Sequence, residues 1–284
     1  MYGYGFGYNF ARTSGVDVVV LTPDTIFSTD LYDWWDFTDN TTLTLSGSRI
    51  DAIDSKASGS TRQLTSSSSN RPQIVSNQVN GLQVANFDGV SEFMEVPSST
   101  ALYNFLHDQS NGGMVIVVSR VTDANPNAPY QILDNGGTAT TTVGYLLQYD
   151  DRSSIPVNNV IRIRAARNVI LTNTFTTIST DNIFETQQFN SLINIVDPNN
   201  GIASERSKLT VNFGVEEKTN VSTDAPSNAN ASFDLTLAKN GIGSSLFFKG
   251  DIAEIIITTG QPTALQLTQT QTYLTNKYGT FPIT

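Results

Sequence analysis

Short apolar runs and polar turns alternate along most of the chain. Runs of β-branched, aliphatic or aromatic residues recur between polar segments, as in a sandwich built from short strands. We predict strands near residues 16–21, 115–118, 143–149, 160–163, 192–196, 208–213 and 252–257. Asn-Gly suits the left-handed dihedral angles of tight hairpin turns. It occurs at Asn80, Asn111, Asn135, Asn200 and Asn240. The pattern predicts an all-β, antiparallel two-sheet sandwich.

Two segments have a helical pattern instead. Residues 99–107 begin at the Ser98-Ser99 pair, which can cap a helix. Residues 264–278 place apolar side chains on one side and end before Gly279, a typical helix terminator. The polar stretch 58–70 predicts a loop. We divide the chain into an N-terminal arm, residues 1–30, and one body, residues 31–284.

Motifs near both ends of the body resemble a known family. The first group is Trp34-Trp35-Asp36, Asp54-Ser55-Lys56, Arg71-Pro72 and Phe87-Asp88-Gly89, in that order. The second is the run 248–257 with the helix that follows it. Together they resemble the concanavalin A-like, laminin-G-like jelly-roll domains of bacterial and tailed-phage surface proteins. The resemblance implies a jelly-roll sandwich. It leaves the function open, because this fold carries lectins, enzymes and display domains alike.

Composition narrows the classes of function. The chain has 284 residues, no cysteine and a net charge of -10. Without cysteine, disulfides, thiolate metal sites and cysteine nucleophiles are excluded. The negative charge disfavours nucleic acid, and no apolar stretch approaches the roughly 20 residues of a membrane helix. Residues 1–7 lack the basic and apolar regions of a signal peptide, so we expect synthesis in a host cytoplasm.

The titratable residues do not form a recognisable catalytic motif. Glycosidases of this fold resemble one another in a Glu-x-Asp-x-x-Glu strand, which this sequence lacks. The single histidine, His107, is expected at a helix end rather than in a triad. The loop 197–201 resembles the start of a calcium loop but lacks the later glutamate, which favours a plain turn. The run 250–257 predicts a buried strand with little room for polar chemistry. We expect no catalytic residue, no metal and no cofactor, although carboxylates from separate strands can still converge.

One predicted strand concentrates positive charge in this acidic chain. Strand alternation places Ile161 and Ile163 on the core face and Arg162 and Arg164 together on the other face. We expect both arginines to be exposed and to bind carboxylates of another copy, of a neighbouring subunit or of an acidic glycan. A solvated strand face is the alternative.

Aromatic residues supply two further candidate contact surfaces. Trp34 and Trp35 are neighbours on a strand, so one ring should point inward and the other outward. The outward ring is a candidate to stack on a sugar or to cover a partner. The alternative is that the arm or a loop covers both rings. The arm has aromatic residues suited to docking on a partner, namely Tyr2, Tyr4, Phe6, Tyr8 and Phe10.

We interpret the chain as a non-enzymatic virion structural protein of a tailed phage. It would be a head decoration, a fibre or a tail-associated adhesin at the virion surface. Its partners would be other virion proteins or copies of itself, with host-surface glycan binding as a secondary role and no nucleic-acid binding or membrane insertion. The alternative is a carbohydrate-active enzyme or a carbohydrate-binding module of the concanavalin A-like fold. A groove with two converging carboxylates would favour the enzyme.

Overall fold

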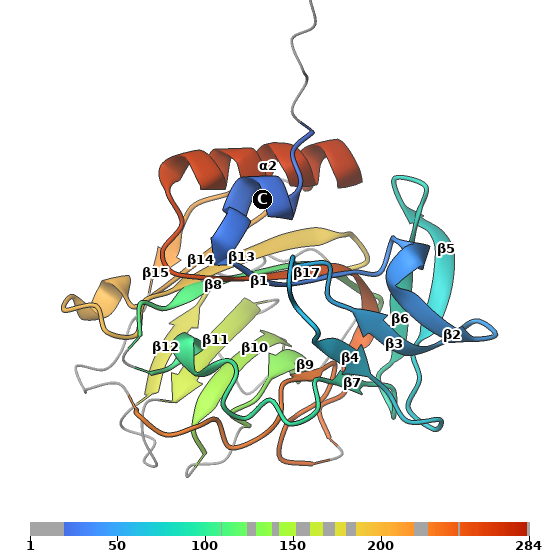
Figure 1. Cartoon of the computed structure of the whole chain (residues 1–284), viewed down its shortest axis with the longest axis horizontal. Coiled ribbons are helices and arrows are strands. Elements are labelled where there is room, and N and C mark those ends of the chain that lie inside the picture. The colour runs from blue at the N-terminus through green and yellow to red at the C-terminus, as the bar shows by residue number, and fades with distance from the viewer. Residues whose placement is uncertain are drawn as a thin grey trace, which may run out of the picture.

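The computed structural model is built in three layers (Figure 1). Two helices, α1 (Pro23–Phe27) and α2 (Ala264–Tyr278), cover one face of a first antiparallel sheet, and a second antiparallel sheet lies on its other side. The predicted all-β, antiparallel two-sheet sandwich with a C-terminal helix is therefore confirmed. The structure describes residues 20–108, 110–123, 129–137, 142–151, 160–166, 174–179, 186–218, 227–243 and 245–282.

The first sheet is organised around β17 (Lys249–Thr259). One edge of β17 pairs with β8 (Gly113–Val121), and β13 (Asn190–Val196) pairs with the far edge of β8. The other edge of β17 pairs with β1 (Leu31–Asp36) and, further along, with β6 (Leu82–Asp88). The outer strands are β14 (Ser207–Val211) and β15 (Glu217–Lys218) beyond β13, and β5 (Gln73–Val79) beyond β6.

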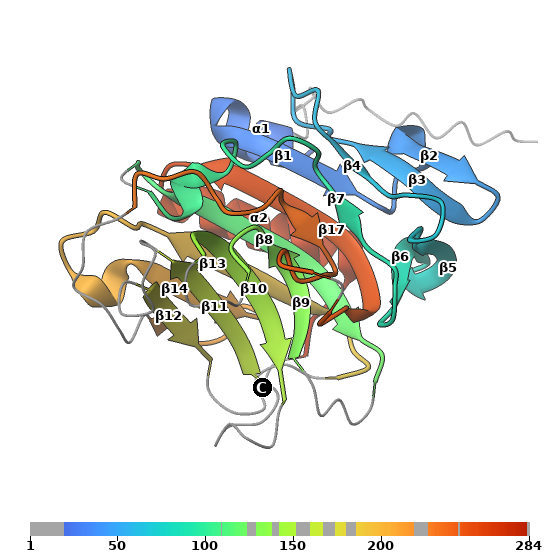
Figure 2. The same cartoon turned by 90° about the horizontal axis from the view of Figure 1, so that it is seen from below.

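The second sheet faces the first across the main core. Its strands, in order, are β12 (Thr174–Ile178), β11 (Val160–Ala166), β10 (Gly144–Asp150), β9 (Pro129–Asp134), β16 (Thr236–Leu237), β7 (Met94–Glu95), β4 (Gln63–Thr65), β3 (Arg49–Asp54) and β2 (Leu43–Ser46). Figure 2 shows β9 to β12 side by side. The sheets meet at one edge, where Arg49 of β3 pairs with Gln73 of β5.

Two apolar clusters hold the layers together. The larger lies between the sheets and contains Trp35, Tyr149, Ile161 and Ile163 among many aliphatic residues. The smaller lies between the first sheet and α2 and includes Trp34. Each large apolar side chain that is fully buried contributes about 1.5–3 kcal/mol to folding. Alternation thus places both faces of β1 in a cluster, with Trp35 in the larger and Trp34 in the smaller, and one face of β11 in the larger cluster.

Six of the seven predicted strands are present, in β8, β10, β11, β13, β14 and β17. The other, residues 16–21, lies outside the described residues up to position 19, and residues 20 and 21 are not in a strand. Asn80 and Gly81 form the tight turn between β5 and β6 with φ angles of 46° and 77°. This confirms Asn80 as a hairpin signal. Gly89 takes a φ of 74° in the turn after β6, where the Asp88 carboxylate accepts three following backbone N–H groups.

The helices were predicted with mixed success. Residues 264–278 form α2. The helix begins with a capping box between Thr263 and Gln266 and ends at Gly279, which has a φ of 86°. The predicted helix 99–107 is wrong, because only Asn104–Leu106 forms a single 3₁₀ turn. Its first residue is held in a turn instead: the Asp234 carboxylate accepts the Ser99 N–H, and the Ser99 hydroxyl donates to a carbonyl. The predicted loop 58–70 contains the short strand β4.

The body begins before residue 31. A capping box at Thr22 and Thr25 starts α1, which the sequence analysis missed. Ile26 and Phe27 are buried against the first sheet, so this part of the segment assigned to the arm belongs to the body. Residues 1–19, with the five aromatic residues proposed for docking, lie outside the described residues. No helix among the described residues is long and apolar enough to span a membrane.

Candidate functional site

A cavity of ≈ 680 Å³ lies between α2, β1 and residues 20–22. Its volume is within the range of about 300–1,000 Å³ that is typical of small-molecule sites. Residues 20–22 line one side of the cavity, and α2 lines the other. The residues that line it are Val20, Leu21, Thr22, Trp34, Asp36, Lys56, Thr272, Tyr273, Asn276 and Lys277. This is our candidate functional site, and we call it the α2 cavity.

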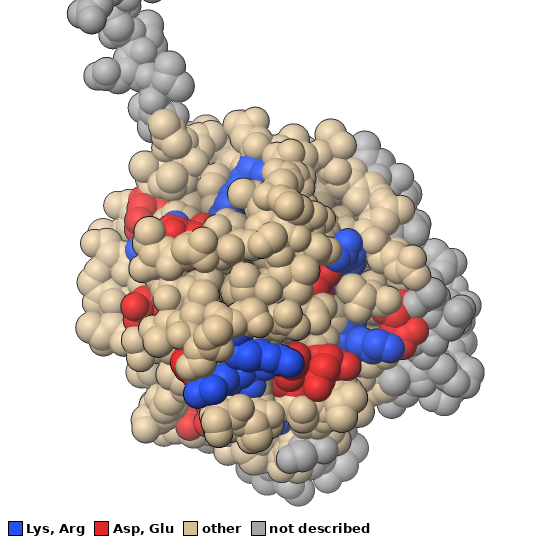
Figure 3. All heavy atoms as spheres, turned by 90° about the vertical axis from the view of Figure 1, so that its right-hand side faces the viewer, with Lys and Arg blue, Asp and Glu red and all other residues tan. Residues whose placement is uncertain are grey.

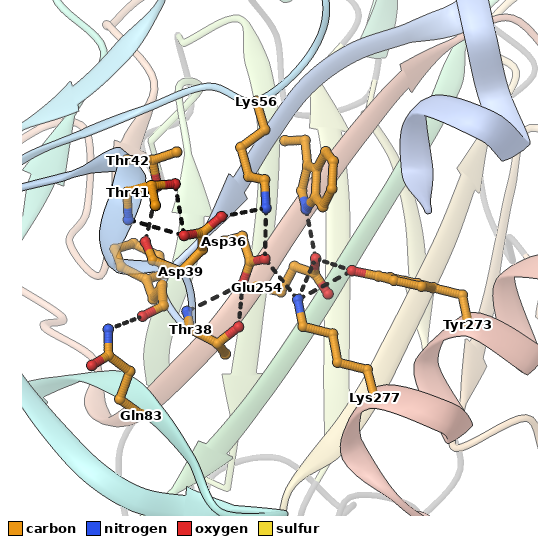
Figure 4. Close-up of polar contacts among 12 residues, drawn as sticks. Asp36, Thr38, Asp39, Thr41, Thr42, Lys56, Gln83, Glu254, Tyr273 and Lys277 are labelled. Atoms are coloured by element: carbon orange, nitrogen blue, oxygen red, sulfur yellow. Dashed lines mark hydrogen bonds and ion pairs between the residues drawn. The ribbon is translucent and has the colours of Figure 1, made fainter. Parts of the chain in front are cut away.

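Regular secondary structure places its polar groups together. On β1, alternation turns Trp34 and Asp36 toward α2, while Trp35 faces the main core. On α2, Tyr273 and Lys277 are four residues apart and so share one face. Figure 4 shows Lys277 and Tyr273 pointing from α2 toward Asp36 and Glu254 on the sheet.

Glu254 is more buried than Asp36, the other acid that Lys277 contacts. It lies on β17, directly opposite Asp36 of β1, and is 1% exposed. Its Oε1 accepts hydrogen bonds from the Trp34 indole, from Tyr273 at 2.6 Å and from Lys277 at 3.0 Å. Its Oε2 accepts one from Tyr278 at 2.8 Å. A buried carboxylate needs such partners, because burying an unpaired charge is very costly. Glu254 therefore ties α2 to the first sheet.

Asp36 and two lysines form the polar floor of the α2 cavity. Lys277 Nζ lies 2.8 Å from Asp36 Oδ2, and Lys56 Nζ lies 3.2 Å from the same oxygen. Burial acts to raise the pKa of Asp36, but Lys277, Thr38 and Lys56 outweigh it, and its pKa is below the usual value. The hydrogen bond from Lys56, at 2.8 Å, lowers the pKa of Asp39 to about 2. The charges are thus paired and fixed in place.

Asp36 and Glu254 are converging carboxylates, the feature that we expected of an enzyme. The Lys277 ammonium contacts both of them. Glycoside hydrolysis requires two carboxyl groups that both face the substrate, about 5–5.5 Å apart in retaining enzymes. Among the described residues that line the α2 cavity, Asp36 is present and Glu254 is not. The site therefore presents one carboxylate to a ligand, and the other is taken up by protein donors.

The tryptophans lie on opposite faces of β1, as predicted. Trp35 is fully buried between the sheets, so it presents no surface to a ligand. Trp34 is 5% exposed and lines the α2 cavity, with Lys56 Nζ 4.2 Å from its ring centroid. Neither ring is an open platform for stacking, because α2 and the core cover them. Trp34 contributes an edge of the α2 cavity.

The two arginines lie elsewhere, on the outer face of β11. Alternation is as predicted, since Ile161 and Ile163 are in the main core. The predicted exposure of both arginines is wrong, because each is partly buried. The Arg162 side chain is 15% exposed and its Nη1 lies 3.4 Å from Asp150 on the neighbouring strand, so it has an acidic partner within the chain. Similar pairing occurs on the face shown in Figure 3, where Lys and Arg side chains lie beside Asp and Glu on a mostly neutral surface.

The remaining candidates, His107 and the loop 197–201, are held by hydrogen bonds within the fold. His107 is buried, its Nε2 lies 3.1 Å from the Ala229 carbonyl, and burial lowers its pKa. The loop 197–201 is a turn in which the Asn200 amide donates to the Asp197 carboxylate at 2.8 Å. Within the described part of the chain, we find no group of three or more His, Cys, Asp or Glu that could hold a metal ion.

The sequence analysis missed most of this cluster. It predicted little room for polar chemistry in the run 250–257, which is wrong, because Glu254 is the centre of the buried network. The available signal was the acid itself: a lone glutamate inside an isoleucine-rich strand must find buried partners. Lys56 and Asp36 were part of the quoted family motifs, but their spacing did not show that they pair. Lys277 and Asn276 gave no local signal.

Comparisons with known proteins relate the chain to others by fold alone. No protein-family model and no curated protein matches it. Among solved structures, it is similar to the binding domain of botulinum neurotoxin serotype D, with a TM-score of 0.55 and 9% identity over 92% of this chain and 56% of that one. It is also similar to Trypanosoma rangeli sialidase in complex with 2,3-difluoro-KDN, with a TM-score of 0.53 and 10% identity over 90% of this chain and 34% of that one.

A third structure, the module CBM40 of Ruminococcus gnavus IT-sialidase bound to α2,3-sialyllactose, has a TM-score of 0.43 and 14% identity over 61% of this chain and 85% of that one. This last likeness is too low to carry an argument. The chain spans about a third of the sialidase chain and just over half of the toxin domain. At 9–10% identity these likenesses show a shared β-rich fold.

Proposed function

We propose that this protein is a non-catalytic carbohydrate-binding sandwich whose α2 cavity holds a neutral saccharide. The observation that carries the proposal is the α2 cavity itself, ≈ 680 Å³ in volume, with an aromatic edge and polar groups held in fixed positions. Pre-positioned polar groups favour binding, because little side-chain entropy is lost when the ligand arrives. The similar solved structures support the β-rich fold, and the proposal for the site rests on the cavity.

The chemistry of the lining fits a sugar. A pyranose has an apolar face of C–H groups and a rim of hydroxyls. Trp34 and Leu21 offer apolar contact. The Asn276 amide can donate and accept hydrogen bonds, and the Thr272 hydroxyl, which donates to the Thr268 carbonyl, can accept one. The charges of Lys56 and Lys277 are offset by nearby carboxylates. A neutral, hydroxyl-rich ligand therefore suits the α2 cavity better than an anion.

Glycoside hydrolysis is the second candidate, because the carboxylates of Asp36 and Glu254 lie on opposite positions of neighbouring strands. We propose the non-catalytic function because Glu254 accepts hydrogen bonds from Trp34, Tyr273, Tyr278 and Lys277, which occupy both of its oxygens. A general acid also needs a pKa near the working pH, whereas the pKa of Asp36 is lowered. Both features suit an anchoring role better than proton transfer.

Replacing Asn276 with alanine is expected to weaken saccharide binding about threefold to tenfold, because one net hydrogen bond contributes about 0.5–1.5 kcal/mol. Asn276 is exposed on α2 and lines the α2 cavity, so the variant should fold normally. The measurement is a screen against neutral oligosaccharides, followed by calorimetric titration with the strongest binder. Gln271→Ala is the matched control, because Gln271 is exposed on the same helix and lines a different depression. Equal affinities of both variants would contradict the site.

We further propose that the domain is displayed on the virion of a tailed phage. The support is the resemblance of its motifs to tailed-phage surface proteins, the absence of cysteine and the aromatic residues of positions 2–10. The test is to purify intact particles on a density gradient and to probe them with an antibody to this chain. Co-migration with particles is expected. Recovery only in the soluble fraction of the lysate would contradict this location.

A further inference from the structure

A groove lies on the other flank of α2 from the α2 cavity. It consists of two neighbouring depressions of ≈ 180 Å³ and ≈ 250 Å³, which share Phe213 and Gln271 as lining residues. The α2 cavity borders β1, whereas this groove borders β13, which is separated from β1 by β17 and β8. We call it the β13 groove. Its walls are formed chiefly by Ile193, Ile195, Phe213, Leu267, Gln271 and Phe281.

The β13 groove is apolar and nearly uncharged. Ile193 and Ile195 belong to the apolar cluster beneath α2. Phe213 and Leu267 pack against the edge of that cluster and are partly exposed. Among the described residues that line the groove, Glu216 alone has a charged side chain. The α2 cavity, by contrast, is lined by two lysines and a carboxylate. The groove therefore suits an uncharged, apolar occupant.

An unusual turn places the Phe213 ring in the groove. Asn212 and Phe213 have φ angles of 51° and 59°. The Gly214 N–H donates to the Val211 carbonyl at 2.8 Å, which closes the turn. Two successive positive φ angles are those of a type I′ turn, in which Asn-Gly is the preferred pair. A phenylalanine in place of that glycine is strained, and such strain is concentrated at functional sites. The ring packs against Phe281, with 5.7 Å between the ring centroids.

The N-terminal arm contains a segment with the chemistry that the β13 groove requires. Residues 1–11, which we call the aromatic segment, have no charged side chain and have aromatic residues at positions 2, 4, 6, 8 and 10. Side chains alternate along an extended segment, so these five rings lie on one side when the segment is extended. Rings two residues apart are then separated by about 6.6 Å, and consecutive rings can enter neighbouring depressions.

The chain that precedes the described residues is long enough to reach the groove. Residue 20 is the first described residue and lines the α2 cavity, on the other flank of α2. Residues 12–19 connect it to the aromatic segment and span at most about 27 Å when fully extended. An α-helix with its side chains is about 10–12 Å across. The connection can therefore pass over α2 from one flank to the other.

We infer that the aromatic segment docks in the β13 groove of its own chain, with its rings against Phe213 and Phe281. A short tether holds the segment near its own groove at an effective concentration of about 1 mM. In dilute solution this exceeds the concentration of any other copy, so the contact within one chain is favoured. The inference concerns the free chain, and it does not depend on the function proposed for the α2 cavity.

The test uses the full chain with the photoreactive p-benzoylphenylalanine in place of Phe6. After irradiation, the monomer should contain cross-links from position 6 to the region of Phe213 or Phe281, mapped by mass spectrometry. A second measurement is the rate at which chymotrypsin cleaves the chain after the aromatic residues of positions 2–10. Cleavage should be at least about tenfold slower in the full chain than in a free peptide of residues 1–14, as expected for a tethered contact with a dissociation constant of about 0.1 mM.

Two groove variants should release the aromatic segment without disturbing the fold. Phe213→Gly removes one ring and gives the turn its preferred Asn-Gly pair. Thr268→Tyr fills the groove from an exposed position of α2. Each should reduce the protection from chymotrypsin to about twofold or less, because loss of an aromatic contact weakens docking about tenfold. Circular dichroism of each variant verifies the fold.

The matched control is Leu265→Tyr. Leu265 is 66% exposed on the same helix and lines neither depression, so the added ring should leave the protection unchanged. Asn276→Ala, which alters the α2 cavity, should also leave it unchanged.

Four results would overturn the inference. Cross-links to the groove that occur only in dimers would place the aromatic segment on a second copy. Cross-links to Lys56 or Asn276 would place it in the α2 cavity. Cleavage as fast as that of the free peptide would mean that the segment does not dock. Equal protection in Thr268→Tyr and Leu265→Tyr would mean that it docks outside the β13 groove.

Discussion

Replacing Glu254 with alanine is expected to lower the free energy of unfolding by about 3–5 kcal/mol, the usual cost of breaking a buried ion pair by removing one partner. Among the described carboxylates the variant leaves Lys277 with Asp36, and it leaves the hydroxyls of Tyr273 and Tyr278 and the Trp34 indole without this acceptor. The measurement is equilibrium denaturation followed by circular dichroism.

The matched control for this variant is Glu205→Ala. Glu205 also contacts a lysine, Lys208 at 3.3 Å, but its side chain is 25% exposed. A surface pair of this kind contributes about 0–1 kcal/mol. If Glu254→Ala were no more destabilising than Glu205→Ala, Glu254 would not be the anchor that joins α2 to the first sheet. Catalysis would then be the alternative role of Glu254.

Trp35→Ala is expected to destabilise the fold by a similar amount, about 3–5 kcal/mol, as large aromatic-to-alanine changes in a core do. Trp35 is fully buried in the cluster between the two sheets. Its removal leaves a cavity that the surrounding strands can fill only in part. The same denaturation experiment measures the effect.

Leu45→Ala is the control for Trp35. Leu45 lies on β2 and is 40% exposed, so its replacement should change the free energy of unfolding by less than about 0.5 kcal/mol. A Trp35→Ala variant that unfolds like the wild type and yet loses saccharide binding would contradict the burial of this ring. It would make Trp35 the ring that points outward, which the sequence analysis left open between Trp34 and Trp35.

The fold could be predicted from the sequence because its signals are local. Alternation along 160–163 was enough to place Ile161 and Ile163 in the core, and the Asn80-Gly81 pair specified a hairpin turn. The helix 99–107 was wrong for a reason that is not local. Asp234, which holds the first residue of that segment in a turn, lies 135 positions away from it.

The candidate sites depend on contacts between distant segments. Trp34 and Glu254 are 220 positions apart and meet only because β1 pairs with β17. The arginines show the same limit. Alternation correctly placed Arg162 and Arg164 on one face, but it did not show that Asp150 of the neighbouring strand would reach Arg162. Side-chain direction follows from the sequence of one strand, whereas pairing requires the order of strands in the sheet.

The most direct test of the central claim is to measure binding and turnover on the same neutral saccharide. The ligand found by the screen is incubated with the wild type, with Asn276→Ala and with Asp36→Asn, and new reducing ends are counted while mass spectrometry follows the intact ligand. We expect the wild type to bind the saccharide and to return it unchanged, with weaker binding in Asn276→Ala. Release of new reducing ends by the wild type, abolished in Asp36→Asn, would contradict the account and establish a hydrolase.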